Sequence, residues 1–166
     1  MRRLILLLTL LALGWVDLVA QHARTQVFVV SNHTEVKEEL RSYHIRFTTL
    51  FTPTTELALK PSSHLSNYLQ SQIRTEKDTR RLRPLKEIAS LADQYIWYCA
   101  GFTRNSKKLL FCVLVGREEA SSIPGTQKSG PGPHFPIIFD GGTRICQAVF
   151  DPSSNSFILL RWNGEG

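Results

Sequence analysis

The chain has 166 residues, of which 42% are hydrophobic and 20% are charged, so it is too apolar for a disordered protein. This length suits one domain rather than two. With 10 Gly, 8 Pro and 3 Cys, the composition excludes a collagen-like chain and a disulfide-dense mini-protein. The net charge of +6 would favour an acidic surface or an anionic ligand as a partner, although such a charge also serves solubility alone.

The N-terminus is typical of a secretory signal. Arg2 and Arg3 precede the uncharged, mostly apolar run Leu4–Val16, which is too short to span a bilayer and suits a signal h-region. We expect cleavage after Ala20 or Ala23, which leaves residues 21–166 as a single secreted or periplasmic domain. The alternative is an uncleaved N-terminal anchor.

The next segment alternates between strand and helix signals. Residues 25–31 are rich in β-branched side chains and predict a strand. Asn32 predicts a helix cap, with Glu35 three residues later completing a capping box. Asn32 also begins an Asn-His-Thr sequon, which would be glycosylated only in a eukaryotic secretory pathway. Residues 44–51 predict a second strand.

Two short helices are expected next. Leu65, Leu69 and Ile73 recur at helical spacing after Pro61, with Ser62 or Ser63 as the cap. Residues 74–87 carry six Lys or Arg, three carboxylates and no aromatic residue, so no specific nucleic-acid signal is present. We expect this run to be a solvated connector, for example with Glu76 paired to Arg80, and Pro84 to interrupt any helix before a second one over 85–91.

From Tyr95 onward the chain has β character. Residues 117–136 are rich in Gly and Pro and predict a mobile loop. Asp140-Gly141-Gly142 predicts a hairpin turn, with a phosphate-cradling turn as the weaker alternative. The expected strands are residues 95–103, 108–115, 136–139, 145–150 and 157–162.

This order of elements predicts an α+β fold. We expect an antiparallel sheet of about four to six strands, with two short helices packed on one face. The strands over 95–102 and 109–115 are apolar at consecutive positions, which is typical of central strands that are covered on both sides.

The cysteines predict a crosslink. With a two-residue turn at Asn105-Ser106, Cys99 would lie directly opposite Cys112, within the distance that a disulfide bridges. An oxidising compartment would favour that bond. The alternative is a pair of buried free thiols, and Cys146 could be inert, pair with another chain or replace one partner. The spacing of the three cysteines indicates no metal site, and no cofactor is expected.

No catalytic spacing is recognisable among the five histidines. His134, in the Gly/Pro-rich loop, and Asp140, at a strand end, are the weak catalytic candidates. A catalytic site would have to bring both side chains and a third polar group into one concavity.

About the last 75 residues, from Gln94 on, resemble the ends of small exported proteins without a named family. The resemblance rests on FDGGTRICQAVFDPSSNSFILLRWNGEG, in which a DGG turn leads into a hairpin and a closing Asn-Gly, and loosely on the segment from Gln94 and Tyr95 to Gly101. It implies one compact exported α+β domain and transfers no activity to any residue.

We therefore expect a small exported domain without enzymatic activity, acting through binding or as an envelope accessory protein. A binding module of this kind would expose an apolar or aromatic patch, for example at Trp97 or Trp162. The alternatives are a secreted hydrolase that acts on an anionic substrate, and a membrane-surface protein that retains its N-terminal anchor.

Overall fold

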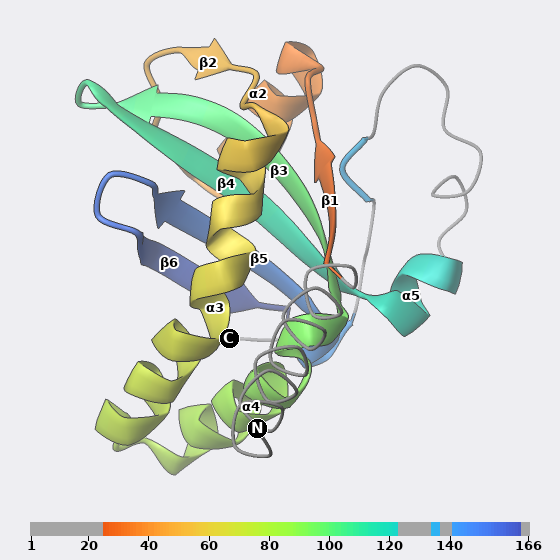
Figure 1. Ribbon diagram of the computed structural model, residues 1–166, viewed down its shortest axis with the longest axis vertical. Coiled ribbons are helices and arrows are strands. Elements are labelled where there is room, and N and C mark those ends of the chain that lie inside the picture. Colours follow the sequence, from red (N-terminus) through yellow and green to blue (C-terminus); the bar gives the residue numbers. More distant parts are fainter. Residues whose placement is uncertain (1–24, 123–133, 137–140, 164–166) are drawn as a thin grey trace, which may run out of the picture.

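The computed structural model describes residues 25–122, 134–136 and 141–163, and shows an α+β fold built on a six-stranded mixed sheet. The expected signal at 1–20, most of the Gly/Pro-rich loop and residues 137–139 of the strand expected over 136–139 lie outside the described residues. Figure 1 shows α3 crossing the front of the sheet and leading into α4. The elements are β1 (Gln26–Val29), α2 (His33–Ser42), β2 (Leu50–Phe51), α3 (Thr55–Thr75), α4 (Thr79–Ser90), β3 (Tyr95–Arg104), β4 (Lys107–Gly116), α5 (Arg117–Ser122), β5 (Ile145–Asp151) and β6 (Ser156–Trp162), with short 3₁₀ turns at Ala92–Gln94 and Gly142–Arg144.

The sheet order is β1-β3-β4-β5-β6, with β2 also paired to β3. Strands β3 to β6 form the expected antiparallel meander. The expectation of a purely antiparallel sheet is wrong, because β1 runs parallel to β3, with Gln26 opposite Ile96. The chain between β1 and β3 crosses over through three helices, and a crossover of this length permits parallel pairing.

The β3–β4 hairpin turns at Asn105 and Ser106, whose φ angles are +51° and +62°. Positive φ at both central residues defines the two-residue turn whose twist matches that of the flanking strands. Arg104 therefore lies opposite Lys107, and the register places Cys99 opposite Cys112 as the sequence predicts.

Both faces of the sheet carry apolar clusters, as expected for β3 and β4. Trp97 and Cys99 join the cluster beneath α3 and α4, which we call the helix-pair face. Tyr98 and Ala100 point the other way and join the cluster that receives side chains from α2, which we call the α2 face. The expectation that the helices cover one face only is not confirmed, since α2 contributes to the cluster opposite α3.

Both proline-based helix boundaries are wrong. Helix α3 begins at Thr55, capped by Thr54, and continues through Pro61. Helix α4 is capped by Asp78 and continues through Pro84. A proline removes one backbone donor and costs about 3 kcal/mol in a helix interior. Burying the predicted stripe, including Leu65 and Leu69 on α3, offsets this cost, because each fully buried aliphatic side chain contributes about 1.5–3 kcal/mol.

Three further boundaries differ from expectation. The strand expected over 44–51 is confined to Leu50–Phe51, because the chain leaves α2 through His44 at a φ of +56°. The Gly/Pro-rich loop begins with the helical turn α5. Of the expected turn at 140–142, Asp140 lies outside the described residues, and Gly142, at a φ of +52°, begins the 3₁₀ turn Gly142–Arg144.

Candidate ligand pocket beside α2

A pocket of about 490 Å³ lies between α2 and the sheet, on the α2 face. Val113 of β4 and Gln147 of β5 line it from the sheet, and Asn163 follows β6. The segment 134–136 closes another side. Helix α2 contributes Glu35, Glu38, Glu39 and Ser42, and Tyr43 follows the helix as its C-cap. This site is called the α2 pocket below.

Helix α2 directs its carboxylates to the pocket because of its sequence spacing. Val36 and Leu40 are buried against the sheet and fix the orientation of the helix. Glu35 and Glu39 are four residues apart and therefore share the face beside that buried stripe. Burial, and then the neighbouring Glu35 carboxylate, raises the pKa of Glu39 above its ordinary value.

Glu35 binds the segment 134–136 to α2. One carboxylate oxygen lies 2.7 Å from Nδ1 of His134, and the other accepts a hydrogen bond from the backbone N–H of Phe135. The Phe135 ring packs edge-on against Phe111 of β4, at 5.5 Å between centroids. His134 remains half exposed at the mouth of the pocket, with 54% of its side chain accessible.

Gln147 forms a polar floor within an otherwise apolar strand. The residue is 4% exposed, and its amide Nε2 donates to Oδ1 of Asn163 at 3.1 Å. Gln147 also hydrogen-bonds the hydroxyl of Tyr43, whose pKa is raised by burial and by the charge of Glu39, and lowered by this hydrogen bond. The floor is thus a hydrogen-bonded set of amides and a neutral phenol.

Of the two catalytic candidates, the structure places His134 at this pocket, while Asp140 lies outside the described residues. Sequence reasoning missed Glu39, Tyr43 and Gln147. The sequence did offer one signal for this site. Gln147 is a single polar residue in the apolar segment ICQAVF, residues 145–150, and its position is buried. Glu35 was assigned to a capping box; Asn32 does cap α2, but the Glu35 carboxylate binds residues 134 and 135 instead.

None of the three cysteines forms a disulfide in this structure, and all three are fully buried. Cys99 and Cys112 face each other on the helix-pair face. The Cys146 thiol donates to the Thr143 carbonyl oxygen at 3.4 Å. None of the three thiols is exposed as a nucleophile would need to be.

The expected exposed aromatic patch is not found at the tryptophans, because Trp97 is 1% exposed and Trp162 is 7% exposed. Arg81 lies over the Trp162 ring at 5.8 Å. Within the described part of the chain, Leu59 and Ile158 are the large hydrophobic residues that are exposed.

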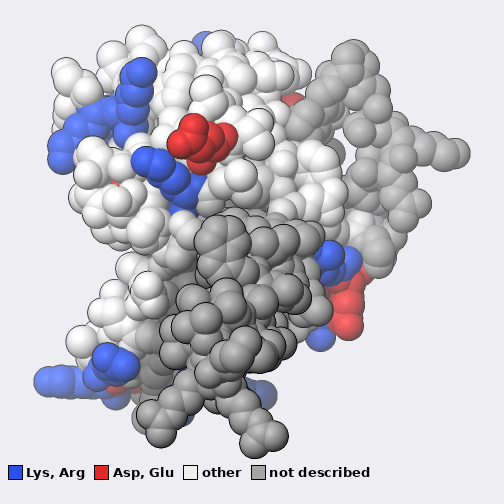
Figure 2. Space-filling view, in the orientation of Figure 1, with Lys and Arg blue, Asp and Glu red and all other residues white. Residues whose placement is uncertain are grey.

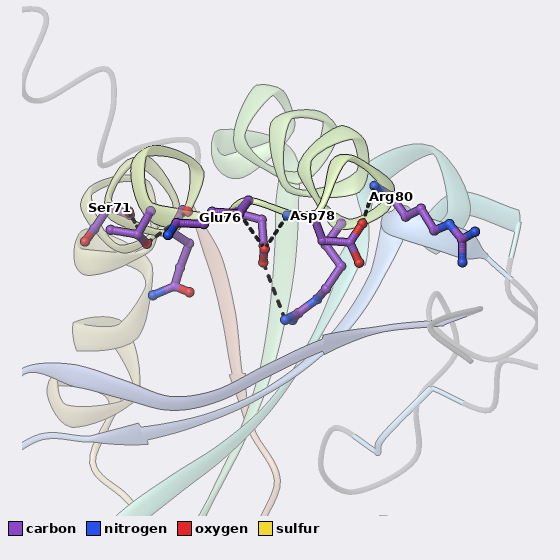
Figure 3. Close-up of polar contacts among 8 residues, drawn as sticks. Ser71, Glu76, Asp78 and Arg80 are labelled. Atoms are coloured by element: carbon purple, nitrogen blue, oxygen red, sulfur yellow. Dashed lines mark hydrogen bonds and ion pairs between the residues drawn. The ribbon is translucent and has the colours of Figure 1, made fainter.

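The expectation that the basic run over 74–87 is a solvated connector is wrong for most of its length, because residues 76–78 alone connect α3 to α4 and residues 79–87 belong to α4. The two carboxylates of this connection, Glu76 and Asp78, accept hydrogen bonds from backbone N–H groups (Figure 3). The Glu76 carboxylate accepts from the backbone N–H groups of Lys77 and Asp78. It pairs with Arg81 at 3.5 Å rather than with Arg80. Figure 2 shows the Lys and Arg side chains of this view in separate groups rather than one continuous patch.

Asn32, the conditional glycosylation site, is exposed at the start of α2, and its glycosylation stays a prediction. No cluster of three or more metal-ligating side chains is found in residues 25–122, 134–136 and 141–163. Over the same residues, no helix combines the length and apolarity that crossing a bilayer requires.

Comparison with protein-family models, with curated proteins and with solved structures finds no match to this chain.

Proposed function

We propose that this chain is an exported, non-enzymatic binding protein that holds a small cationic ligand in the α2 pocket. The observation that carries the proposal is the pocket itself, in which carboxylates, amides and a phenol converge over an apolar wall. Its volume of about 490 Å³ falls in the range of small-molecule sites.

The charge of the lining supports a cationic ligand. The chain carries +6 overall, yet the pocket lining includes three glutamates and no Lys or Arg among the described residues. Two of the glutamates, Glu35 and Glu39, are partly buried, so water screens their charges less than it screens charges on the open surface. An ammonium or guanidinium group would lower the pKa of Glu39 and complete its hydrogen bonding. The anionic ligand that the net charge favours does not suit this pocket.

The apolar part of the lining supports a ligand with a hydrophobic body. Val113, Phe135 and Ile145 supply the apolar side of the pocket lining, and the glutamates of α2 supply its acidic side. Gln147 and Asn163 offer amide groups between the two sides. A ligand that carries a positive group at one end and an apolar group at the other matches both sides of the pocket.

The test compares benzylamine, benzyl alcohol and benzoate, which share one ring and differ in charge. In ¹H–¹⁵N NMR titrations, we expect benzylamine alone to shift the side-chain amide signals of Gln147 and Asn163. Glu39→Gln should weaken benzylamine binding about tenfold, the cost of one charge-assisted hydrogen bond. The matched control is Glu56→Gln, since Glu56 is exposed on α3 and does not line the pocket. Equal or tighter binding of benzoate would contradict the proposal.

A second candidate function is that of a secreted hydrolase, favoured by the 2.7 Å pair of Glu35 and His134 at the pocket mouth. A carboxylate that orients an imidazole is the arrangement of a general base. The test is hydrolysis of neutral and cationic aryl esters by the purified chain, compared with His134→Gln. Ester turnover that falls in this variant would favour the hydrolase. If the parent chain and the variant hydrolyse the esters equally, at the background rate, the result would favour the binding protein. Membrane-surface association through a retained N-terminal anchor has support from the sequence alone.

A further inference from the structure

We propose that Cys99 and Cys112 form an intrachain disulfide that closes while the chain folds and is then sealed beneath α3, with Cys146 left as the thiol. The proposal concerns the helix-pair face, so it is independent of the ligand in the α2 pocket. It assigns the pairing and also the stage at which the bond can form.

The backbone around Cys99 has the geometry that a cross-strand disulfide needs. The Cys99 carbonyl oxygen accepts from the Val30 N–H at 2.9 Å, so the polar groups of Cys99 face β1 and not β4. Cys99 and Cys112 are therefore a directly opposed pair that exchanges no backbone hydrogen bonds. Such pairs bring Cα atoms to about 4.5 Å and side chains closest together, inside the range that disulfides span.

The same register excludes Cys146 from the bond. Cys112 lies opposite Ala148 on β5, and Cys146 is two residues along that strand, opposite Leu114. Diagonal neighbours of this kind have Cα atoms about 7–8 Å apart, too far for a disulfide without backbone movement. Cys146 is also held by the Thr143 carbonyl oxygen, which leaves Cys99 as the partner that Cys112 can reach.

Helix α3 covers the pair in the folded protein. Both residues are 0% exposed, and the Cys99 thiol contacts the Ala58 carbonyl oxygen of α3 at 3.7 Å. Burial and the neighbouring Cys99 raise the pKa of the Cys112 thiol, which keeps it protonated and unreactive. Thiol–disulfide exchange also needs a path by which the oxidising disulfide reaches a cysteine sulfur, and the burial of both residues closes that path in the folded chain. The bond must therefore form before α3 packs.

The chemistry is two exchange steps with an oxidising disulfide, such as oxidised glutathione or a disulfide oxidoreductase. The thiolate of one cysteine attacks a sulfur of the reagent, forms a mixed disulfide and releases one reagent thiol. The thiolate of the other cysteine then attacks the protein sulfur of that mixed disulfide and releases the second thiol. The chain loses two protons and two electrons, and the reagent disulfide is reduced to two thiols.

The test compares two orders of addition for the full chain. In one sample, the reduced, denatured chain refolds with oxidised glutathione present; in the other, the reduced chain folds first and meets oxidised glutathione afterwards. Free thiols are then alkylated in denaturant and counted by intact mass. We expect one alkylated cysteine, Cys146, in the first sample and all three in the second.

Two variants control the result. Cys146→Ala should still form the bond on oxidative refolding and show no alkylated thiol, whereas Cys112→Ala should form no intrachain bond. Reduction of the oxidised protein by dithiothreitol should be at least about tenfold slower in native buffer than in urea. Three free thiols after oxidative refolding, or a bond that includes Cys146, would overturn the pairing. Bond formation after folding, or equally fast reduction in both buffers, would overturn the sealing.

Discussion

Glu39 is a carboxylate whose burial has a consequence for stability. Its pKa in the folded chain lies above its ordinary value of 4.5, first because of burial and second because of Glu35. The folded chain therefore holds this proton more tightly than the unfolded chain does. As the pH rises from the Glu39 pKa of the unfolded chain to that of the folded chain, the free energy of unfolding decreases. Above the pKa of the folded chain, the full cost of the buried charge is present.

Glu39→Gln should remove that cost. We expect the variant to be more stable than the parent chain at about pH 7.5, with the difference gone below about pH 4, where the parent carboxyl is protonated in both states. The measurement is urea unfolding at both pH values. Glu35, Glu38, Tyr43 and His134 also face this position, so the pH dependence is read as the difference between the two chains. Glu56→Gln, at an exposed position of α3, should show no such gain at neutral pH. An unfolding curve that Glu39→Gln leaves unchanged at pH 7.5 would contradict the account.

At this scale the sequence predicts residues whose role depends on near neighbours. Asn32 caps α2 because a side-chain oxygen needs only the next two or three N–H groups, which is a local condition. The pairing of Glu35 with His134, 99 residues away, depends on where two distant segments lie. No local pattern encodes that distance, so the charged side of the pocket could not be predicted.

The β3–β4 turn is an element whose sequence is not optimal for its shape. Ser106 has a φ of +62°, a conformation that costs a non-glycine residue about 1 kcal/mol. We expect Ser106→Gly to stabilise the protein by about 0.5–1 kcal/mol, because glycine is the residue this turn prefers at its second central position. The measurement is the midpoint of chemical unfolding.

The control for this prediction is the same substitution in a helix. Ser66 is exposed in the middle of α3, where glycine is less favourable than serine by about 0.5 kcal/mol. Ser66→Gly should therefore destabilise the protein. If both substitutions shift the midpoint in the same direction, the left-handed conformation of Ser106 is not what limits the turn.

The helices show where element prediction reaches its limit. Pro61 and Pro84 are strong local stop signals, yet α3 and α4 continue through both. Each helix has a capping residue upstream, Thr54 or Asp78, and each buries apolar side chains on the sheet, on both sides of the proline in α3 and after the proline in α4. The stabilisation that each helix gains by packing against the sheet depends on tertiary structure. The sequence alone therefore could not show that it exceeds the cost of the backbone hydrogen bond that the proline removes. The β3–β4 register could be predicted because it depends only on the length of a turn.

At the scale of the whole chain, the export prediction stays untested, and it can be measured directly. The full chain is expressed in a bacterium with a secretory pathway. It should be recovered outside the cytoplasm, and its intact mass should match a chain that begins at Gln21 or Arg24. Leu8→Arg should retain the full-length mass in the cytoplasm, because a charge breaks the apolar run. His22→Arg, beyond the first expected cleavage position, is the control. A secreted chain that keeps Met1 would favour the anchor alternative.

The parallel pairing of β1 has a consequence for the order of assembly. The β3–β4 and β5–β6 hairpins join neighbouring residues and can form early, whereas Gln26 must find Ile96 across about 70 residues of chain. Helix α2 lies between β1 and β2, and both of these strands attach to β3. Helix α2, which carries the pocket glutamates, thus docks on the sheet in a late step of folding. A ligand bound between α2 and the sheet would therefore slow the dissociation of β1 and α2 from the sheet, the first step of unfolding.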